Sequence, residues 1–177
     1  VEDSTTVDTI APVTTDSGTY TNWHNLDVTV TLTPTDERSG VDDTYYCVDQ
    51  VGTCTPTTLG TSVIVSAEGT NYVRYYSVDN AGNAEEVKTA TNTVKIDTTP
   101  PTTSLSPDAP AEGELIVSEG DTTITVTCDD GSGGGCSEVG YQLSDLCSTN
   151  SADYTIQSGS ETSFNVSSEE DVCTYAE

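Results

Sequence analysis

The sequence repeats itself halfway along its length, and this repeat is the strongest constraint on its fold. The segment VKIDTTPPTTS at 94–104 is echoed by VDTIAPVTT at 7–15, and matching Asp8 to Asp97 gives a period of 97 − 8 = 89 residues. This period has the length of one small β-sandwich domain and is too long for a solenoid unit. The chain of 177 residues is therefore expected to hold two domains, each with a small core.

Alternating residues predict that both repeats are built from strands. In LDVTVTLTP (26–34), Val28, Val30 and Leu32 alternate with threonines, which is typical of a strand with one buried face. The counterpart in the second repeat is DTTITVTC (121–128). An acidic, glycine-bearing turn follows in each case, and then a second strand, DTYYCVD (43–49) or EVGYQLS (138–144). No segment shows apolar residues at helical spacing over three turns, so we expect an all-β fold.

The two repeats differ at their ends. The first continues through strands at 61–67 and 72–79, the loop NAGNAEE (80–86) and a last strand at 93–97. The second offers strands within 161–168 and 169–177, and setting Val172 against Val73 leaves it without the loop and the last strand. Residues 1–7 resemble the end of the first repeat, which predicts a last strand whose own domain is absent. The expected division is a donor strand at 1–7, one domain at 8–97 and an incomplete domain at 98–177.

Three segments carry a resemblance to a known family. IDTTPPTTSLS (96–106), TDERSGVDDTYYCVD (35–49) and YVRYYSVDNAGNAEE (72–86) resemble the immunoglobulin-like tandem repeats of bacterial and archaeal surface proteins. The resemblance covers most of the first repeat and the first two-thirds of the second. It implies two tandem immunoglobulin-like β-sandwich domains, the second without its last strand. Such domains occur in adhesins, surface-layer proteins, appendages and secreted enzymes, so the resemblance alone does not select one function.

Cysteine usage favours disulfides and an extracellular location. The chain has six cysteines, no C-x-x-C pair and a single histidine, which argues against a zinc site. Disulfides persist in oxidising surroundings, so we expect the protein outside the cell, at the cell surface. Six cysteines allow many pairings, and the one preferred here is local and respects the predicted domains. It joins Cys47 to Cys54, Cys128 to Cys136 and Cys147 to Cys173.

The charge of the chain excludes two classes of partner. Four Lys plus Arg stand against thirty Asp plus Glu, giving a formal net charge of −26. Nucleic acid and anionic membranes would be repelled by this charge. No apolar run reaches the length of a membrane span, so no membrane insertion is expected. The N-terminal segment VEDSTTVDT lacks the pattern of a signal peptide, and any export signal is expected to have been removed.

The acidic turns leave one cofactor open, a calcium ion. Calcium binds six to eight oxygens from carboxylates and carbonyls. The candidate ligands are Asp36, Asp42, Asp43, Asp97, Asp129 and Asp130, with Glu37, Glu138 and Asp8 beside them. No stretch matches the twelve-residue calcium loop, so solvated loop charge is the preferred interpretation. Asp79 is expected to hydrogen-bond the backbone of its own turn, DNAGN.

The sequence does not point to an enzyme. His24 is the sole histidine and stands beside the sole tryptophan, Trp23, without a nucleophile turn nearby. Trp23 and the tyrosines leave a carbohydrate-binding module of a secreted enzyme as an alternative, although tyrosine is also common in strands. Asn165 in NVS fits the glycosylation acceptor pattern, and the threonine-rich faces are candidates for O-linked sugar.

Two structural functions explain the strand at the front and the missing strand at the back. In the first, the chain is a subunit of an extracellular filament, assembled head to tail by donor-strand complementation. The polymerisation strand would consist of Val1, Glu2, Asp3, Ser4, Thr5, Thr6 and Val7. In the second, the chain is a fragment of a larger adhesin or surface-layer protein, and neighbouring domains of the same polypeptide supply the missing strand.

Overall fold

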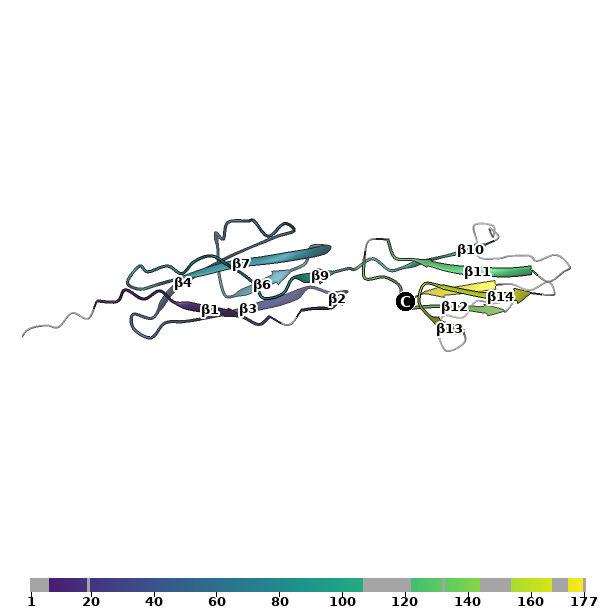
Figure 1. Ribbon diagram of the computed structural model, residues 1–177, viewed down its shortest axis with the longest axis horizontal. Coiled ribbons are helices and arrows are strands. Elements are labelled where there is room, and N and C mark those ends of the chain that lie inside the picture. Colours follow the sequence, from purple (N-terminus) through teal and green to yellow (C-terminus); the bar gives the residue numbers. More distant parts are fainter. Residues whose placement is uncertain are drawn as a thin grey trace, which may run out of the picture. The chain divides into compact units, whose positions relative to one another are not determined.

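The computed structural model describes residues 7–18, 20–106, 122–131, 133–143, 154–166 and 172–176 (Figure 1). It divides into two compact units, unit 1 (Val1–Thr98) and unit 2 (Thr99–Glu177). All regular elements in these ranges are β-strands, which confirms the all-β prediction. Within the same ranges, no helix has the length and apolarity needed to cross a membrane.

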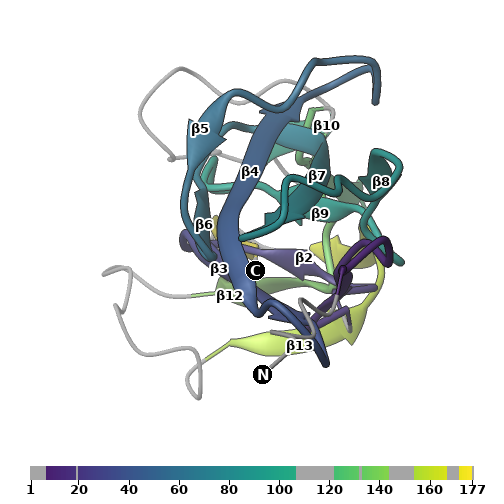
Figure 2. The same ribbon diagram turned by 90° about the vertical axis from the view of Figure 1, so that its left-hand side faces the viewer.

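Unit 1 is a sandwich of two sheets. Its strands are β1 (Val13–Asp16), β2 (Trp23–His24), β3 (Val28–Thr35), β4 (Val41–Asp49), β5 (Thr58–Leu59), β6 (Ser62–Val65), β7 (Gly69–Asp79), β8 (Lys88–Thr89) and β9 (Val94–Ile96). One sheet has the order β1-β3-β6, and the other has the order β2-β9-β7-β4-β5, with β8 also paired to β7. Figure 2 shows β7 beside β4 and β9. The strands predicted from the sequence are present, while β1, β2, β5 and β8 had no sequence prediction.

The core of unit 1 follows from the alternation of its strands. Val28, Val30 and Leu32 of β3 are buried, and the threonines between them are exposed, as a period-two pattern requires. Opposite them, β7 and β9 contribute buried apolar side chains from the second sheet. The buried cluster comprises Val28, Val30, Leu32, Val63, Val65, Val73, Tyr75, Val94 and Ile96.

The chain enters and leaves unit 1 at opposite ends of β7. On the entry side, the main-chain carbonyl of Asp8 accepts a hydrogen bond from the side chain of Asn83, which in turn contacts Asp79, the last residue of β7. On the exit side, Ile96 pairs with Gly69, the first residue of β7. Because β7 has 11 residues, its ends lie about 33 Å apart at the usual rise of a strand.

Unit 2 repeats most of this arrangement. Its strands are β10 (Thr102–Ser106), β11 (Thr122–Asp129), β12 (Glu138–Leu143), β13 (Thr155–Ser158), β14 (Glu161–Val166) and β15 (Val172–Ala176). The sheet β10-β11-β14 corresponds to β1-β3-β6, and β13-β12-β15 corresponds to β5-β4-β7. Its core includes Ile124, Val126, Val139 and Val172, all 0% exposed.

Strand register fixes how the two units correspond. In unit 1 Val48 lies opposite Val73, and in unit 2 Leu143 lies opposite Val172. Val172 is therefore the counterpart of Val73, as the sequence alignment predicted. On the same offset, 172 − 73 = 99, the β7 residues that pair with β9 correspond to 168–170, outside the described residues. The described part of unit 2 includes no counterpart of β8 or β9.

A matched pair of isoleucines tests the sandwich directly. Ile96 is 0% exposed in the core, whereas Ile64 is 65% exposed on the outer face of β6. We predict that Ile96→Ala lowers the free energy of unfolding of unit 1 by about 2–5 kcal/mol, because a cavity forms. Ile64→Ala should change it by less than ~0.5 kcal/mol. Urea unfolding of the full chain measures both, and equal effects would contradict this description of the core.

Candidate functional site

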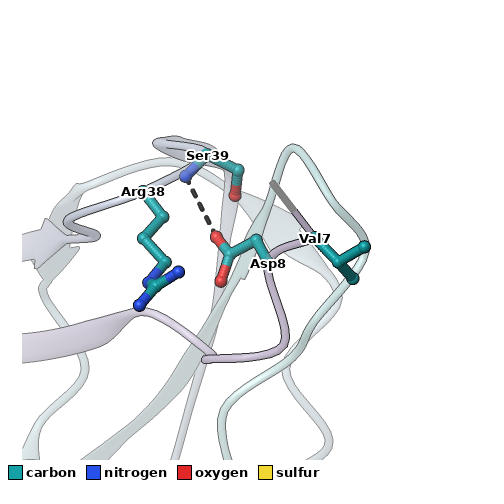
Figure 3. Close-up of a pocket in the computed structure, with 4 residues that line it drawn as sticks. All are labelled: Val7, Asp8, Arg38 and Ser39. Atoms are coloured by element: carbon teal, nitrogen blue, oxygen red, sulfur yellow. Dashed lines mark hydrogen bonds between the residues drawn. The ribbon is translucent and has the colours of Figure 1, made fainter. Parts of the chain in front are cut away.

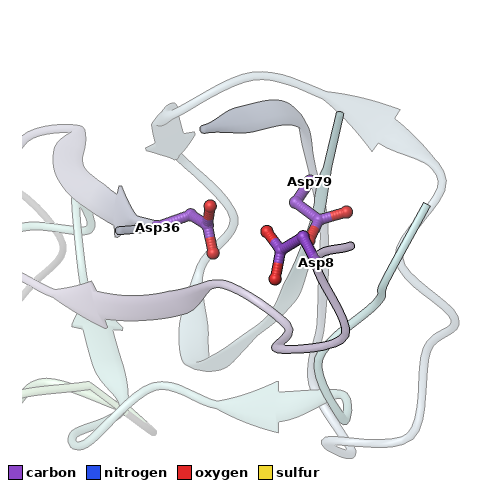
Figure 4. A group of neighbouring side chains, drawn as sticks. All are labelled: Asp8, Asp36 and Asp79. Carbon is purple, nitrogen blue, oxygen red and sulfur yellow. The ribbon is translucent and has the colours of Figure 1, made fainter. Parts of the chain in front are cut away.

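Three aspartates from distant segments meet at the entry end of unit 1. Asp8 precedes β1, Asp36 follows β3, and Asp79 ends β7. One carboxylate oxygen of each lies within 4.8 Å of the other two, and Figure 4 shows the three side chains gathered together. Asp79 is only 1% exposed, while Asp8 and Asp36 are partly exposed. We name these three residues the aspartate cluster.

Asp79 holds the turn that follows it. Its Oδ1 accepts hydrogen bonds from the backbone N–H of Ala81 (2.9 Å) and Asn83 (2.7 Å), and its Oδ2 accepts one from Asn83 Nδ2 (2.7 Å). Gly82 in the same turn has a φ of 89°, a left-handed conformation that glycine adopts without steric cost. The prediction that Asp79 hydrogen-bonds the backbone of DNAGN is confirmed.

The other two aspartates hold the loop between β3 and β4. Asp36 Oδ1 accepts from the backbone N–H of Arg38 (3.1 Å) and of Gly40 (2.8 Å). Asp8 Oδ2 accepts from the backbone N–H of Ser39 in the same loop (3.0 Å), as Figure 3 shows. Asp8 therefore joins the entering chain to the β3–β4 loop.

A small pocket opens next to Asp8. Its volume is about 280 Å³, and Val7, Asp8, Arg38 and Ser39 line it (Figure 3). The other oxygen of Asp8, Oδ1, accepts a hydrogen bond from the backbone N–H of Ile10 (3.0 Å). Among the described lining residues, Asp8 and Arg38 bring one charge of each sign to the pocket, Ser39 adds polar groups, and Val7 is the apolar side chain.

Hydrogen bonds favour the ionised form of two members of the aspartate cluster. The backbone of Ile10, the polar groups of Ser39 and the positive charge of Arg38 hold the pKa of Asp8 below its ordinary value. For Asp79, burial raises the pKa, but hydrogen bonds from Asn83, Ser39 and Ala81 outweigh burial, and the pKa of this carboxyl is also lowered. Both carboxyls are consequently charged at neutral pH.

The carboxylates of the aspartate cluster stabilise turns, and their oxygens are also possible ligands for a metal ion. Every member of the aspartate cluster accepts backbone N–H groups, which explains its position without an ion. Carboxylate oxygens are equally the ligands that calcium prefers. Calcium binding thus stays a prediction, and of its candidate ligands the structure places Asp36 with Asp8 and Asp79.

The other predicted ligands lie apart from the aspartate cluster. On β4, Asp42 is exposed, and Asp43 accepts a hydrogen bond from the hydroxyl of Tyr45 (3.1 Å), which raises the pKa of Tyr45. In unit 2, Asp129 accepts from the N–H of Gly131 (2.8 Å). Asp130 accepts from the N–H of Gly135 (2.6 Å). At the exit end of unit 1, the backbone N–H of Asp97 donates to His24.

Two of the three predicted disulfides are confirmed. Cys47 is bonded to Cys54 and Cys128 to Cys136, with Cα–Cα distances of 6.2 and 6.4 Å. Cys173 is also disulfide-bonded, while its predicted partner Cys147 lies outside the described residues.

The loop closed by Cys47–Cys54 is held from within by an aspartate. Asp49 accepts the backbone N–H groups of Gly52, Thr53 and Cys54 at 2.7–3.0 Å. Burial raises the pKa of Asp49, but these N–H groups outweigh burial and lower it overall. The Cys47–Cys54 disulfide and the Asp49 carboxylate together hold the loop that follows the C-terminal end of β4.

Two predictions fall at the edge of what is described. Val1–Thr6 of the predicted donor strand lie outside the described residues, and Val7 is 73% exposed. The backbone of Asn165 lies in β14 opposite Thr123, and its side chain lies outside the described residues.

A side-chain bridge between the two sheets of unit 1 escaped the sequence analysis. Glu85 Oε1 accepts the backbone N–H of Ser77 in β7 (3.0 Å), and its Oε2 accepts that of Thr14 in β1 (3.2 Å). Lys88 Nζ lies 2.5 Å from the same Oε2 and donates to the carbonyl of Thr14 (3.0 Å). The Glu85 side chain is 5% exposed. We name this pair the Glu85–Lys88 bridge. Because Glu86 beside it is also a glutamate, the sequence did not indicate which of the two is buried and bonded.

The aromatic residues of unit 1 pack against protein groups. Tyr45 and Tyr76 stack on each other across β4 and β7, with ring centroids 5.1 Å apart and planes 17° apart. Lys95 Nζ lies 5.9 Å from the ring centroid of Trp23. The two tyrosine rings therefore face one another instead of forming one flat platform for a sugar.

Comparisons with known proteins do not identify this chain. No family model matches the chain, and no curated protein matches it. Among solved structures, the chain is similar to the fibronectin(III)-like modules of Clostridium thermocellum CbhA, with 14% identity and a TM-score of 0.38. The match covers 93% of this chain and 92% of that chain. A likeness this distant carries no functional argument, so the site is interpreted from its own geometry.

The lowered pKa values predict acid sensitivity of unit 1. Because Asp8 and Asp79 titrate below their ordinary value of 3.8, their stabilisation is present above that pH and is lost as the pH falls through the lower, folded-state values. We expect the Tm of unit 1 to fall steeply below about pH 4. Asp79→Asn should lower the Tm at pH 7 and flatten this fall, whereas the exposed Asp42→Asn should do neither. An unchanged profile in Asp79→Asn would contradict this role.

The calcium prediction is tested by the same measurement. An ion bound to the folded state raises its stability by about 2.7 kcal/mol at a concentration one hundred times the dissociation constant. We expect calcium to raise the Tm of unit 1 more than magnesium does, and Asp36→Asn to abolish the difference. Asp129→Asn, in a turn of unit 2, is the control. No rise in Tm with either ion, or a rise that Asp36→Asn leaves unchanged, would show that the aspartate cluster only holds turns.

Proposed function

We propose that this chain is a non-catalytic structural subunit of an extracellular filament or cell-surface appendage. In this assembly, a strand from one copy completes unit 2 of the next copy. The observation that carries the proposal is the difference between the two units. Unit 2 has counterparts of β1 and of β3 to β7, and its described part holds no counterpart of β9.

In unit 1, β9 occupies the place that the proposed donor strand would take in unit 2. This strand pairs with β7 in antiparallel and with β2 in parallel orientation. It places Val94 and Ile96, both 0% exposed, in the core. A sandwich without this strand has an open sheet edge and an uncovered core, and an added strand satisfies both.

Residues 1–7 have the pattern of such a strand. The segment TTVD at 5–8 aligns with VKID at 94–97, so Val7 takes the position of the buried Ile96. In its own chain Val7 is 73% exposed. Donor and acceptor belong to different surfaces of one chain, so the contact is heterologous and propagates into a fibre.

Composition and cysteine chemistry support an extracellular structural role. The disulfides suit an oxidising compartment, and short-range bonds of this kind reinforce small cores. A formal charge of −26 keeps free subunits apart and makes assembly depend on a specific contact.

One observation favours an alternative in which the strand comes from the same polypeptide. The chain enters and leaves unit 1 at opposite ends of β7, as consecutive domains of a tandem array require. The protein would then be part of a larger adhesin or surface-layer protein. A carbohydrate-binding module of a secreted enzyme is the third candidate, and the mutual stacking of Tyr45 and Tyr76 does not favour it.

Electron microscopy and size-exclusion chromatography of the purified chain test the filament. We expect fibres from the wild type, and monomers from a deletion of residues 1–7 and from Val7→Asp, since a charge cannot enter the core. Ile10→Asp, at a position 57% exposed beyond the predicted strand, is the matched control and should still assemble. Monomeric wild type under all conditions would contradict the proposal.

Synthetic peptides separate the filament from the larger surface protein. A peptide of residues 1–10 should raise the Tm of unit 2 in the deletion variant. If only a peptide of residues 91–98 does so, the acceptor exists but another domain fills it. If neither peptide has an effect, unit 2 does not accept a strand at this position.

A further inference from the structure

The first strand of unit 1 is held differently on its two sides. On one side, β1 pairs with β3 through four residues, from Val13 opposite Thr35 to Asp16 opposite Leu32. On the other side, it has no strand partner in the described sheets, and side chains take the place of one. The Glu85–Lys88 bridge bonds both the N–H and the C=O of Thr14, which are the groups that a neighbouring strand would bond.

Two further contacts tie β1 to β7. The hydroxyls of Thr14 and Ser77 are hydrogen-bonded at 2.7 Å, and both residues are buried. Asp16 Oδ2 accepts the hydroxyl of Tyr75 (3.0 Å) and the backbone N–H of Thr91 (3.2 Å). The side chains of Thr14 and Asp16, two positions apart in β1, are thus both hydrogen-bonded to the second sheet.

The direction of the chain decides how these bonds are loaded. Tension applied at the two ends of unit 1 pulls β1 along its own axis, because the chain enters beside Asp79 and leaves beyond Gly69, at the other end of β7. Bonds that lie across the direction of sliding share the load, and several must break together. Bonds at an end that peels away would instead break one at a time.

We propose that unit 1 is a tension-bearing module and that the Glu85–Lys88 bridge is the element that resists sliding of β1. This inference rests on the proposed structural function, in which subunits or domains are joined end to end. Charge-assisted hydrogen bonds are stronger than neutral ones, and the 5% exposure of the Glu85 side chain shields them from water. The bridge therefore makes β1 the part of unit 1 that most resists sliding under tension.

In the described part of unit 2, a neutral contact joins the corresponding strands. Between β10 and β15, the Thr103 and Thr174 hydroxyls are hydrogen-bonded at 2.5 Å, in the place of the Asp16–Tyr75 contact. The described part of unit 2 contains no charged pair equivalent to the Glu85–Lys88 bridge. In a single chain under force, unit 2 should unfold before unit 1.

Single-molecule force spectroscopy of the full chain, held at its two ends, tests the proposal. We expect Glu85→Gln to speed unfolding of unit 1 at constant force about tenfold or more, since one amide cannot accept both N–H groups and pair with Lys88. Glu86→Gln is the matched control, with the same change of charge at the adjacent exposed residue. Lys88→Met, at a side chain 37% exposed, removes the other half of the bridge and should act in the same direction.

A core variant separates mechanical resistance from general stability. Val63 lies in β6, away from β1, and is 0% exposed. The variant Val63→Ala should therefore lower the Tm of unit 1, and its changed lifetime under force identifies which unfolding event belongs to unit 1. At an equal loss of Tm, Glu85→Gln should shorten the lifetime under force more than Val63→Ala. Equal lifetimes, or no difference between Glu85→Gln and Glu86→Gln, would overturn the proposal. Single molecules need no assembly, so either result leaves the filament test independent.

Discussion

One carboxylate, that of Glu85, joins the two sheets of unit 1 where the backbone cannot. It accepts an N–H from β1 and an N–H from β7, and Lys88 compensates its charge. A buried charge with its partners in place is tolerated, whereas the same charge without them would be strongly destabilising. Pairing with β3 holds one side of β1, and this contact ties the other side to the second sheet.

The same chemistry recurs at the turns, and it gives part of the acidic composition a structural use. Asp36, Asp49 and Asp79 each accept two or three backbone N–H groups of the loop that follows them. Loops without regular structure leave such groups unpaired, and a short carboxylate side chain pairs them locally. A chain with few apolar residues thereby gains order from its polar ones. Disulfides add to this in both units.

Local patterns predicted what is local. The alternation of Val28, Val30 and Leu32 predicted β3. The bond between Cys47 and Cys54 was predicted because they are the two cysteines of the first repeat and lie close together in the chain. The strand β1 was missed because only Thr14 in it is buried, so it shows no apolar alternation. The aspartate cluster joins residues 79 − 36 = 43 and 36 − 8 = 28 positions apart, and only the register of the strands brings them together.

The most direct test of the central role of Glu85 is hydrogen exchange of two backbone amides, those of Thr14 and Ser77, measured by NMR on the native protein. If Glu85 accepts both, they should exchange as slowly as the buried amides of β7, and Glu85→Gln should speed the exchange of at least one of them while Glu86→Gln leaves both slow. Exchange of Thr14 as fast as that of exposed loop amides in the wild type would show that β1 is not held in this way, and would contradict the account.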